Sequence, residues 1–362
     1  MSDIEKRKTR HIRISLEENV QTNVSTGFED VKLIHRALPE IDLDDVDTST
    51  ELFGRKLKAP LIISAITGGT QYAKKINETL ATAAEETGIG IGVGSQRIAV
   101  EQPEVQDTFS IVREKAPNAL VLGNMGCPQI SLGWGVQEAE ACIEMIQADA
   151  LAVHMNPLQE AVQVGGDTNY SGVISRVSEI ASNIDTPIIM KETGCGIAYE
   201  EAVKLEKAGV AGLEVSGVGG TSWAAVEHFI AKEEGVADQE YLGKALWDWG
   251  IPTAVSVVET SKSTSLKIIA SGGVRTELDI AKSLVLGADS AGIAHPFLEK
   301  AVEGVEAVIK LIENTVLELK TVMFLTGART VEELKGKPAV IRGGTAEWLR
   351  MRGFDPEDYS FR

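Results

Sequence analysis

The stretch KIIASGGVRTELDIAKSLVLGADSAGIA, residues 267–294, decides the fold class of this chain. It holds two apolar runs, 267–271 and 289–294, on either side of an amphipathic segment, 276–287, that opens with a threonine cap and closes with glycine. Neither apolar run alternates polar with apolar residues, which is typical of parallel strands that are buried on both faces. The stretch therefore predicts a β–α–β unit.

The same pattern repeats along the rest of the chain. Further apolar runs precede this unit, and they are separated by helix-like segments such as 73–88 and 200–209, both of which end in glycine. These runs lie at 61–66, 89–93, 119–123, 150–154, 187–191 and 211–216. Eight β–α units predict an α/β fold of the (β/α)8 barrel (TIM barrel) type, with a doubly wound open sheet as the alternative.

The length of 362 residues suits one barrel domain with additions. Residues 1–60 precede the first strand and are expected to pack on a single barrel domain that spans 61–362. Residues 222–262 are predicted to form a long insertion after the sixth strand, either a lid or an interface, because the segment is long and contains Trp223, Trp247 and Trp249.

The composition narrows the possible classes of protein. A hydrophobic content of 43% is enough for a large core, and a net charge of −18 provides no basic field for nucleic acid. The sparse cysteines, Cys127, Cys142 and Cys195, indicate a reducing compartment. The N-terminus lacks the apolar segment of a signal peptide, and no apolar run is long enough to cross a membrane, so we expect a cytoplasmic protein.

Polar and glycine residues follow nearly every predicted strand. Barrel enzymes place their catalytic groups at this carboxyl end of the strands, whereas a purely structural protein has no reason to gather polar residues there. The segments are TGGT (67–70), GSQR (94–97), NMG (124–126), HMNPLQE (154–160), KETG (191–194), SGVGGT (216–221), SGGVR (271–275) and HP (295–296). The sequence therefore predicts an active site at this end of the barrel.

The segment SGGVR is the most informative of these. Gly272 and Gly273 separate a strand from a helix, so backbone N–H groups can approach a phosphate closely, and Arg275 adds a full positive charge. The seventh and eighth strands of a barrel are the expected place for a phosphate. A plain tight turn is the alternative interpretation.

Two groups of cations have open interpretations. Lys191 ends an apolar strand, so it should face an anion or a reactive group, unless it pairs with Glu192 or another acid at the rim. The N-terminal basic run at 6–8, with Arg10 and His11, is either a solvated tail or a segment that folds over a diphosphate.

Taken together, these segments resemble the type 2 isopentenyl-diphosphate delta-isomerases, the FMN-dependent enzymes, in their archaeal form. The shared elements span nearly the whole chain in the expected order. They are RK (7–8), TGG (67–69), GSQR (94–97), GN (123–124), HMNPLQE (154–160), KETGCG (191–196), GGTSW (219–223) and SGGVR (271–275). SGGVR also occurs in other FMN-binding barrels, whereas HxNxxQE together with GSQR and RK is specific. Ile66 departs from the family, which often has methionine there, and this implies altered packing on the flavin.

The resemblance implies an FMN cofactor, Mg2+, and NADPH as reductant. The implied FMN-binding residues are Ala65, Ile66, Thr67, Ser95, Asn124, Lys191, Ser216, Thr221, Gly272, Gly273, Arg275, Ala294 and His295. The implied substrate-binding residues are Arg7, Lys8, Ser95, Arg97, His154, Asn156 and Gln159. Glu160 is the implied Mg2+ ligand, and Lys191, Gln159 and His154 are the implied catalytic residues. The family assembles as homotetramers or homo-octamers.

The implied reaction interconverts isopentenyl and dimethylallyl diphosphate by a 1,3-allylic proton shift without net redox change, a step of isoprenoid biosynthesis. Reduced FMN would act as acid/base and stabilise the developing cation. A 2-hydroxy-acid oxidase is the first rival, but it needs a histidine base and paired arginines near the sixth or seventh strand, where SGVGGTSW has neither. A flavin dehydrogenase would have to use Cys195 as its base. A non-catalytic flavin-binding protein is the third rival.

Overall fold

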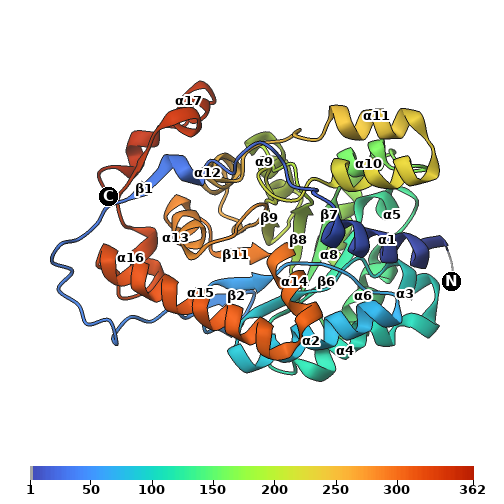
Figure 1. The fold of residues 1–362 in the computed structure, drawn as a ribbon, viewed down its shortest axis with the longest axis horizontal. Helices are drawn as coiled ribbons and strands as arrows, with labels where there is room; N and C mark the ends of the chain where they lie inside the picture. The colour runs from blue at the N-terminus through green and yellow to red at the C-terminus, as the bar shows by residue number, and fades with distance from the viewer. Residues whose placement is uncertain (1–2) are drawn as a thin grey trace.

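The computed structural model describes residues 3–362, with side chains from Arg7 onward. Eight parallel strands close into a barrel in the order β10-β11-β4-β5-β6-β7-β8-β9 (Figure 1). The strands are β4 (Leu61–Ile63), β5 (Gly90–Gly92), β6 (Val121–Gly126), β7 (Ala150–Met155), β8 (Ile188–Glu192), β9 (Gly212–Glu214), β10 (Lys267–Ala270) and β11 (Ser290–Ile293). Each falls on one predicted apolar run, so the barrel prediction is confirmed and the open sheet is wrong.

A helix follows each barrel strand and covers its outer face. These helices are α2 (Gln71–Thr87), α4 (Asp107–Lys115), α6 (Val136–Ile146), α8 (Val173–Asn183), α9 (Tyr199–Lys207), α12 (Thr253–Ser263), α13 (Glu277–Leu286) and α15 (Val305–Thr326). The predicted caps of α13 are present, because Thr276 Oγ1 accepts a hydrogen bond from Asp279 N and Gly287 ends the helix with a φ of 116°. The β–α–β unit of 267–294 therefore has the structure that its sequence predicts.

A short hairpin closes the amino-terminal end of the barrel. It is formed by β2 (Thr50–Leu52) and β3 (Arg55–Leu57), which pair antiparallel. Leu52 and Leu57 are buried and pack with Ile62, Leu122 and other residues of the barrel interior. Burial of this kind stabilises the fold through the apolar area that it removes from water. This end of the barrel is therefore filled, and the carboxyl end is left for function.

The N-terminal segment crosses the molecule. Helix α1 (Asp3–Glu17) lies at the carboxyl end of the barrel, where His295 Nε2 is 2.8 Å from the carbonyl oxygen of Ser15 (Figure 1). Further on, β1 (Val31–Leu33) pairs antiparallel with β12 (Ala339–Ile341) near the C-terminus. The residues before the barrel thus contact it at both ends.

The segment predicted as one insertion has two parts. Helices α10 (Trp223–Glu234) and α11 (Ala237–Ala245) pack on each other beside α1 at the barrel mouth. Helix α12 instead packs against α9 and α13, as the ordinary barrel helix of its unit. The insertion in the strict sense therefore ends before α12. The apolar sequence of α12 gives no sign of this difference.

Shorter elements complete the chain. They are α3 (Arg97–Glu101), α5 (Cys127–Ser131), α7 (Pro157–Val162), α14 (His295–Glu303), α16 (Val331–Lys335), α17 (Gly343–Met351) and the 3-10 helices η1 (Phe28–Asp30), η2 (Pro103–Val105) and η3 (Pro356–Tyr359). Within residues 3–362, no helix combines the length and the apolar content that a membrane crossing requires.

Candidate active site

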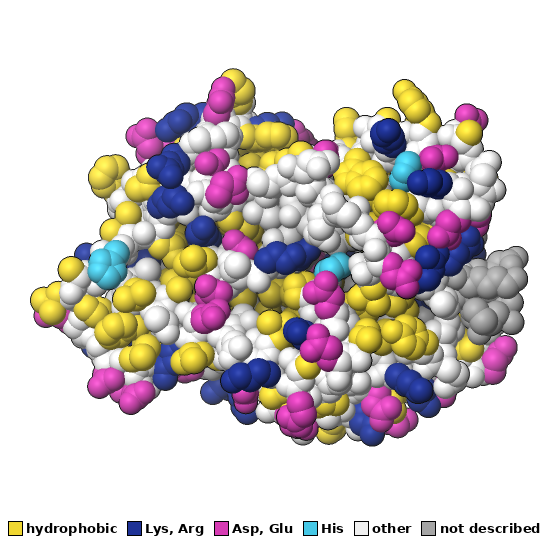
Figure 2. Space-filling model, viewed as in Figure 1, with side chains coloured by type: hydrophobic (Ala, Val, Ile, Leu, Met, Phe, Trp, Pro, Cys, Tyr) yellow, Lys and Arg dark blue, Asp and Glu magenta, His cyan; other side chains and the backbone are white. Residues whose placement is uncertain are grey.

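A cavity of about 280 Å³ opens at the carboxyl end of the barrel, under α1. Every residue that the sequence assigns to the site lines it. These residues are Arg7, Lys8, Ala65, Ile66, Thr67, Ser95, Arg97, Asn124, His154, Asn156, Gln159, Glu160, Lys191, Ser216, Thr221, Gly272, Gly273, Arg275, Ala294 and His295. They come from α1 and from the ends of all eight barrel strands. On the face drawn in Figure 2, acidic and basic side chains are interspersed.

Three charged or polar side chains share one level of the barrel wall. The strand register aligns His154 of β7 with Lys191 of β8, and Lys191 with Glu214 of β9. Lys191 Nζ lies 2.7 Å from Glu214 Oε1, and both side chains are buried. The lysine therefore has an acidic partner, but this partner is Glu214 and not the adjacent Glu192.

The Glu192 side chain binds the backbone of the loop that follows β8. One oxygen of its carboxylate accepts hydrogen bonds from the backbone N–H groups of residues 193–195, so it holds the loop after β8. Burial raises the pKa of Glu192 to about 7, against the opposing effect of these hydrogen bonds. Because strand neighbours point to opposite faces, Lys191 and Glu192 do not pair through their side chains.

His154 is held as a neutral ring. Asn124 Nδ2 donates to the carbonyl oxygen of Val93 at 3.0 Å, which turns Asn124 Oδ1 toward His154 Nδ1 at 2.8 Å. Nδ1 must therefore carry the proton, and Nε2 is left as an acceptor. Burial, with Lys191 and Lys8 nearby, lowers the pKa of His154 to about 4. Since the Nδ1–H is already bonded to Asn124, the ring can donate a hydrogen bond to an anion from Nε2 only after it gains a second proton.

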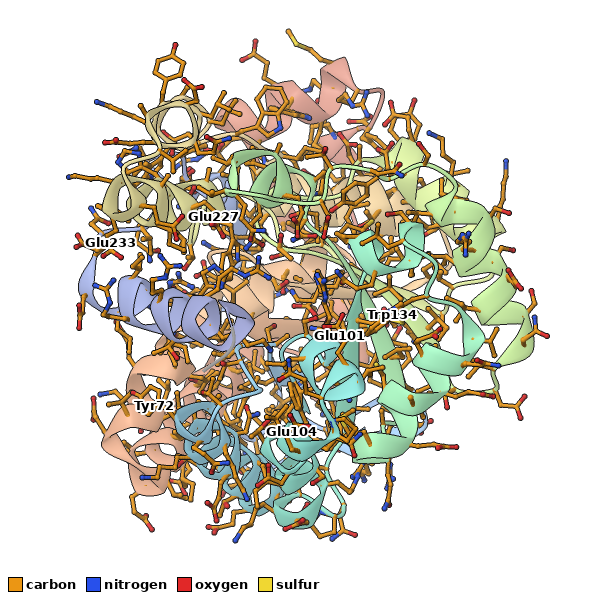
Figure 3. The ribbon with its side chains drawn as sticks, turned by 90° about the vertical axis from the view of Figure 1, so that its right-hand side faces the viewer. Tyr72, Glu101, Glu104, Trp134, Glu227 and Glu233 are labelled. Carbon is orange, nitrogen blue, oxygen red and sulfur yellow. The ribbon has the colours of Figure 1, made fainter. Side chains whose placement is uncertain are left out.

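The N-terminal basic run is helical, and its Lys8 reaches into the cavity. Lys8 Nζ donates to the carbonyl oxygen of Ser95 at 2.9 Å and lies 5.2 Å from the centre of the Phe109 ring. Burial, and then the charge of Arg7, lower the pKa of Lys8 to about 7. Figure 3 shows α1 in front of the barrel. The solvated-tail interpretation is therefore wrong for Arg7 and Lys8, which both line the cavity.

A hydrogen-bonded network connects α1, α7 and α10 at the cavity wall. Gln159 Nε2 donates to Glu227 Oε1 at 2.9 Å, and His11 Nε2 lies 3.0 Å from the same oxygen. Glu227 is 1% exposed, and its Oε2 is buried without a hydrogen-bond partner among the described residues. Burial alone would raise the pKa of Glu227, but His11 and Gln159 hold it below its usual value. Figure 3 places Glu227 above α1.

The rest of HMNPLQE forms a second network at the start of α7. Asn156 Nδ2 donates to Gln159 Oε1 at 3.2 Å and to Glu160 Oε1 at 3.0 Å. Tyr170 donates its hydroxyl hydrogen to Asn156 Oδ1 at 2.9 Å. These bonds orient Gln159 and Glu160 toward the cavity. Among residues whose side chains are described, no three His, Cys, Asp or Glu side chains form a group that could hold a metal ion without other ligands.

The loop SGGVR contacts the loop after β9. Gly272 has a φ of 90° and Gly273 a φ of 70°, and a Cβ on either would clash with the carbonyl oxygen of Gly217 or Gly219. Ser271 Oγ, also at the cavity wall, is buried without a partner in the described part of the chain. The glycines are thus required by the backbone, and the free hydroxyl suits a ligand with acceptor atoms. Arg275 lies at the exposed rim.

Two other candidate side chains have less direct positions. Arg97 Nε lies 2.9 Å from Glu101 Oε1, and its NH1 lies 3.7 Å from Asp167 Oδ2, so it reaches the cavity while paired with acids. Cys195 is not among the residues that line this cavity. Burial raises the pKa of its thiol, which makes Cys195 a poor base and counts against a dehydrogenase that would depend on it.

The sequence reasoning missed several residues of the cavity wall. They are Ile12, Ser15, Ser64, Ile98, Gln129, Gln163, Glu214, Gly292 and Leu298. Glu214 had a usable signal, because it is an acid inside the apolar run 211–216, just as Lys191 is a cation inside 187–191. Glu227 had a weaker signal in the sequence, because it is a carboxylate in the otherwise apolar start of helix α10.

Sequence comparison shows which known proteins this chain is similar to. The sequence matches the family model described as FMN-dependent dehydrogenase over residues 13–108 and 103–342. It is 48% identical over 359 residues to the isopentenyl-diphosphate delta-isomerase of Methanothermobacter thermautotrophicus, which covers 99% of each chain. It is 50% identical over 358 residues to the protein of that name from Pyrococcus furiosus, covering 96% of this chain and 89% of the relative.

Solved structures of lower sequence identity share the fold. A mandelate oxidase superposes with a TM-score of 0.60 at 17% identity and covers 94% of this chain and 97% of its own. A flavocytochrome b2 variant with sulfite bound gives a TM-score of 0.64 at 18% identity, covering 90% of this chain and 81% of its own. At this identity the likeness concerns the barrel architecture alone.

Proposed function

The chain belongs to the isopentenyl-diphosphate delta-isomerases, and on this premise we propose that it interconverts isopentenyl and dimethylallyl diphosphate with the help of FMN. The observation that carries the proposal is the single cavity that combines a glycine-rich loop at β10 with cations from α1 and polar side chains from β7. A phosphate-bearing cofactor and a diphosphate substrate are the two ligands that such a wall would hold side by side.

The residues at β10 and β11 fit an FMN phosphate. Ser271, whose hydroxyl has no partner among the described residues, lines the same cavity as Gly272, Gly273, Ala294 and His295. The hydroxyl, the tight turn of the glycines and the start of α14 offer groups that can donate hydrogen bonds. Thr67, Ser95, Asn124, Lys191, Ser216 and Thr221 then line the space for the ring. When bound in its reduced form, FMN supplies an electron-rich ring that can give or take a proton and stabilise positive charge.

The substrate diphosphate would contact the α1 side of the cavity. Arg7 and Lys8 approach it from α1, Arg97 from α3, and His154 and Asn156 from β7. Opposite charge and several donors fix the diphosphate, and this fixes the carbon chain that it carries. Glu160 is the carboxylate at this wall, and one carboxylate with substrate oxygens is enough for a largely hydrated Mg2+.

The protein's share in the proton shift would fall to the Gln159–Glu227 pair. An amide does not titrate, but Gln159 is hydrogen-bonded to the buried carboxylate of Glu227, whose low pKa keeps it ionised. Gln159 would face the isoprenyl carbons, and Glu227 would stabilise the positive charge that develops there. His154, already neutral, would gain a proton on binding the diphosphate.

The remaining parts of the proposal concern the working form of the enzyme. We propose that NADPH or a similar reductant keeps FMN reduced and that the protein acts in the cytoplasm as a homotetramer or homo-octamer. The rival 2-hydroxy-acid oxidase would need a histidine base beside paired arginines at the sixth or seventh strand. The neutral His154 stands on β7, which is the fourth barrel strand, so its place does not favour that reaction.

Turnover under controlled redox conditions tests the proposal. The purified protein is incubated without oxygen with FMN, Mg2+ and either NADPH or dithionite, and isopentenyl diphosphate is followed by product analysis. We expect dimethylallyl diphosphate with the flavin reduced and little or none with it oxidised. Tight FMN binding without conversion would instead support the non-catalytic flavin-binding protein, and conversion without flavin would refute the cofactor's role.

A further inference from the structure

A buried ion pair lies in the cavity wall at the position proposed for the flavin ring. Lys191 Nζ is 2.7 Å from Glu214 Oε1 and donates to the carbonyl oxygen of Glu192 at 3.1 Å. Ser64 Oγ donates to the same Glu214 oxygen at 2.8 Å. Lys191 is 7% exposed and Glu214 is 2% exposed. Both belong to the cavity wall, so a ligand in the cavity meets the pair and not a lone lysine.

Strand β11, which is separated from β9 by β10 in the barrel, leaves room for this carboxylate. A Cβ on Gly292 of β11 would clash with Ser64 Oγ and would lie 3.4 Å from Glu214 Oε1. Among the described residues, none of the other titratable groups near Lys191 provides a carboxylate that pairs with it. His154 on β7 is neutral, Lys8 comes from α1, and the Glu192 carboxylate is bonded to the loop at 193–195. Glu214 is therefore the acid that balances the charge of Lys191.

The balance matters because charge acts strongly in a buried site. A lone ammonium beside reduced FMN would stabilise its anionic form, raising the midpoint potential and making the ring a weaker base. An adjacent carboxylate opposes both effects. Because the reaction has no net redox change, the potential has only to keep FMN reduced, whereas a ring that exchanges protons benefits from retained basicity.

We propose that Glu214 is a positioning residue that orients Lys191 and sets the charge that it presents to FMN, keeping the reduced cofactor more basic and its potential lower than a lone lysine would. The inference rests on the proposed FMN cofactor. Glu214 acts through Lys191 and needs no contact with the substrate.

Midpoint potentials of the reconstituted holoprotein test this role. Glu214→Gln keeps the shape and can still accept from Lys191 Nζ, but it removes one negative charge. We expect this variant to favour reduced over oxidised FMN at least tenfold more than the wild type, a rise of about 30 mV for two electrons. The pKa of the reduced flavin, read from the pH dependence of the potential, should fall. Glu214→Asp, which keeps the charge, should stay near the wild type.

Two further variants make the result specific. Glu259→Gln removes a carboxylate that is also buried, but Glu259 pairs with Arg352 and neither residue lines the cavity, so the potential should not change. Lys191→Gln should shift the preference for reduced FMN at least tenfold in the opposite direction. This second variant keeps the test decisive if Glu214→Gln does not fold.

The outcomes separate this inference from the proposed function. An unchanged or lower potential in Glu214→Gln with FMN bound would overturn the role of Glu214, and so would an unchanged potential in Lys191→Gln. Failure of the wild-type protein to bind FMN would refute the proposed cofactor instead, which flavin absorbance detects before any potential is measured.

Discussion

At the scale of single residues, Lys8 is a cavity side chain whose charge depends on pH near neutrality. Its pKa of about 7 means that it is protonated below neutral pH and loses its charge above it. We therefore expect kcat/KM for isopentenyl diphosphate to fall as pH rises through about 7, because the free enzyme loses a cation that we propose to bind the diphosphate. Lys8→Met should lower kcat/KM about 10- to 100-fold at pH 6.5, as hydrogen bonds to charged groups contribute about 1.5–3 kcal/mol.

The matched control for Lys8 is Lys8→Arg, because arginine keeps its charge throughout this range. Its pH profile should lose the descending limb near pH 7. A limb that persists unchanged in Lys8→Arg would assign the titration to another group, for example to the substrate itself, and would contradict the role of Lys8.

His154 makes a second prediction at this scale. Its pKa of about 4 and the bond from Nδ1 to Asn124 predict a neutral ring, protonated at Nδ1, between pH 6 and 8. Nitrogen-15 NMR of the ligand-free protein should show no titration of this ring over that range, with His154→Gln used to assign its signals. A titration midpoint between pH 6 and 8 would show that the ring is charged more easily than its surroundings imply.

At the scale of elements, the proposed phosphate site depends on the loop between β10 and α13. Gly272→Ala places a Cβ against the carbonyl oxygen of Gly217 at a φ of 90°, so the loop must shift. We expect FMN affinity to fall by more than tenfold, measured by flavin absorbance after dialysis. Gly344→Ala is the control, because its Cβ meets open space within α17. Retained FMN affinity in Gly272→Ala would mean that this loop does not hold the phosphate.

The elements also show what sequence can and cannot predict. The strands were predictable because runs such as 187–190 are short and continuously apolar, which is typical of a parallel sheet covered on both faces. The position of helix α1 over the cavity was not predictable, since its run of charged residues also suits a solvated tail. The acids Glu214 and Glu227 escaped notice for a related reason: a single polar residue in an apolar run does not reveal which cavity its side chain will face, or which distant partner, here Lys191 or His11, will meet it.

At the scale of the whole molecule, an ion pair ties the C-terminal segment to the barrel. Arg352 Nε lies 3.0 Å from Glu259 Oε1, and Trp348 Nε1 donates to the same oxygen at 3.3 Å. Glu259 is 0% exposed, so Arg352→Met would leave a buried charge without its main partner. We expect a loss of about 3 kcal/mol in the free energy of unfolding, measured with urea. A loss under about 1 kcal/mol would contradict this, and Arg352→Met with Glu259→Gln should recover part of it.

The central claim is that this barrel moves a double bond within isopentenyl diphosphate while FMN stays reduced. Proton NMR in D2O tests it most directly, because both isomers and any deuterium that enters them are seen in one spectrum. With the reduced holoenzyme and Mg2+, we expect dimethylallyl diphosphate that carries solvent deuterium, formed over many turnovers without consumption of reductant. Unchanged isopentenyl diphosphate, or product formed in proportion to reductant consumed, would contradict it.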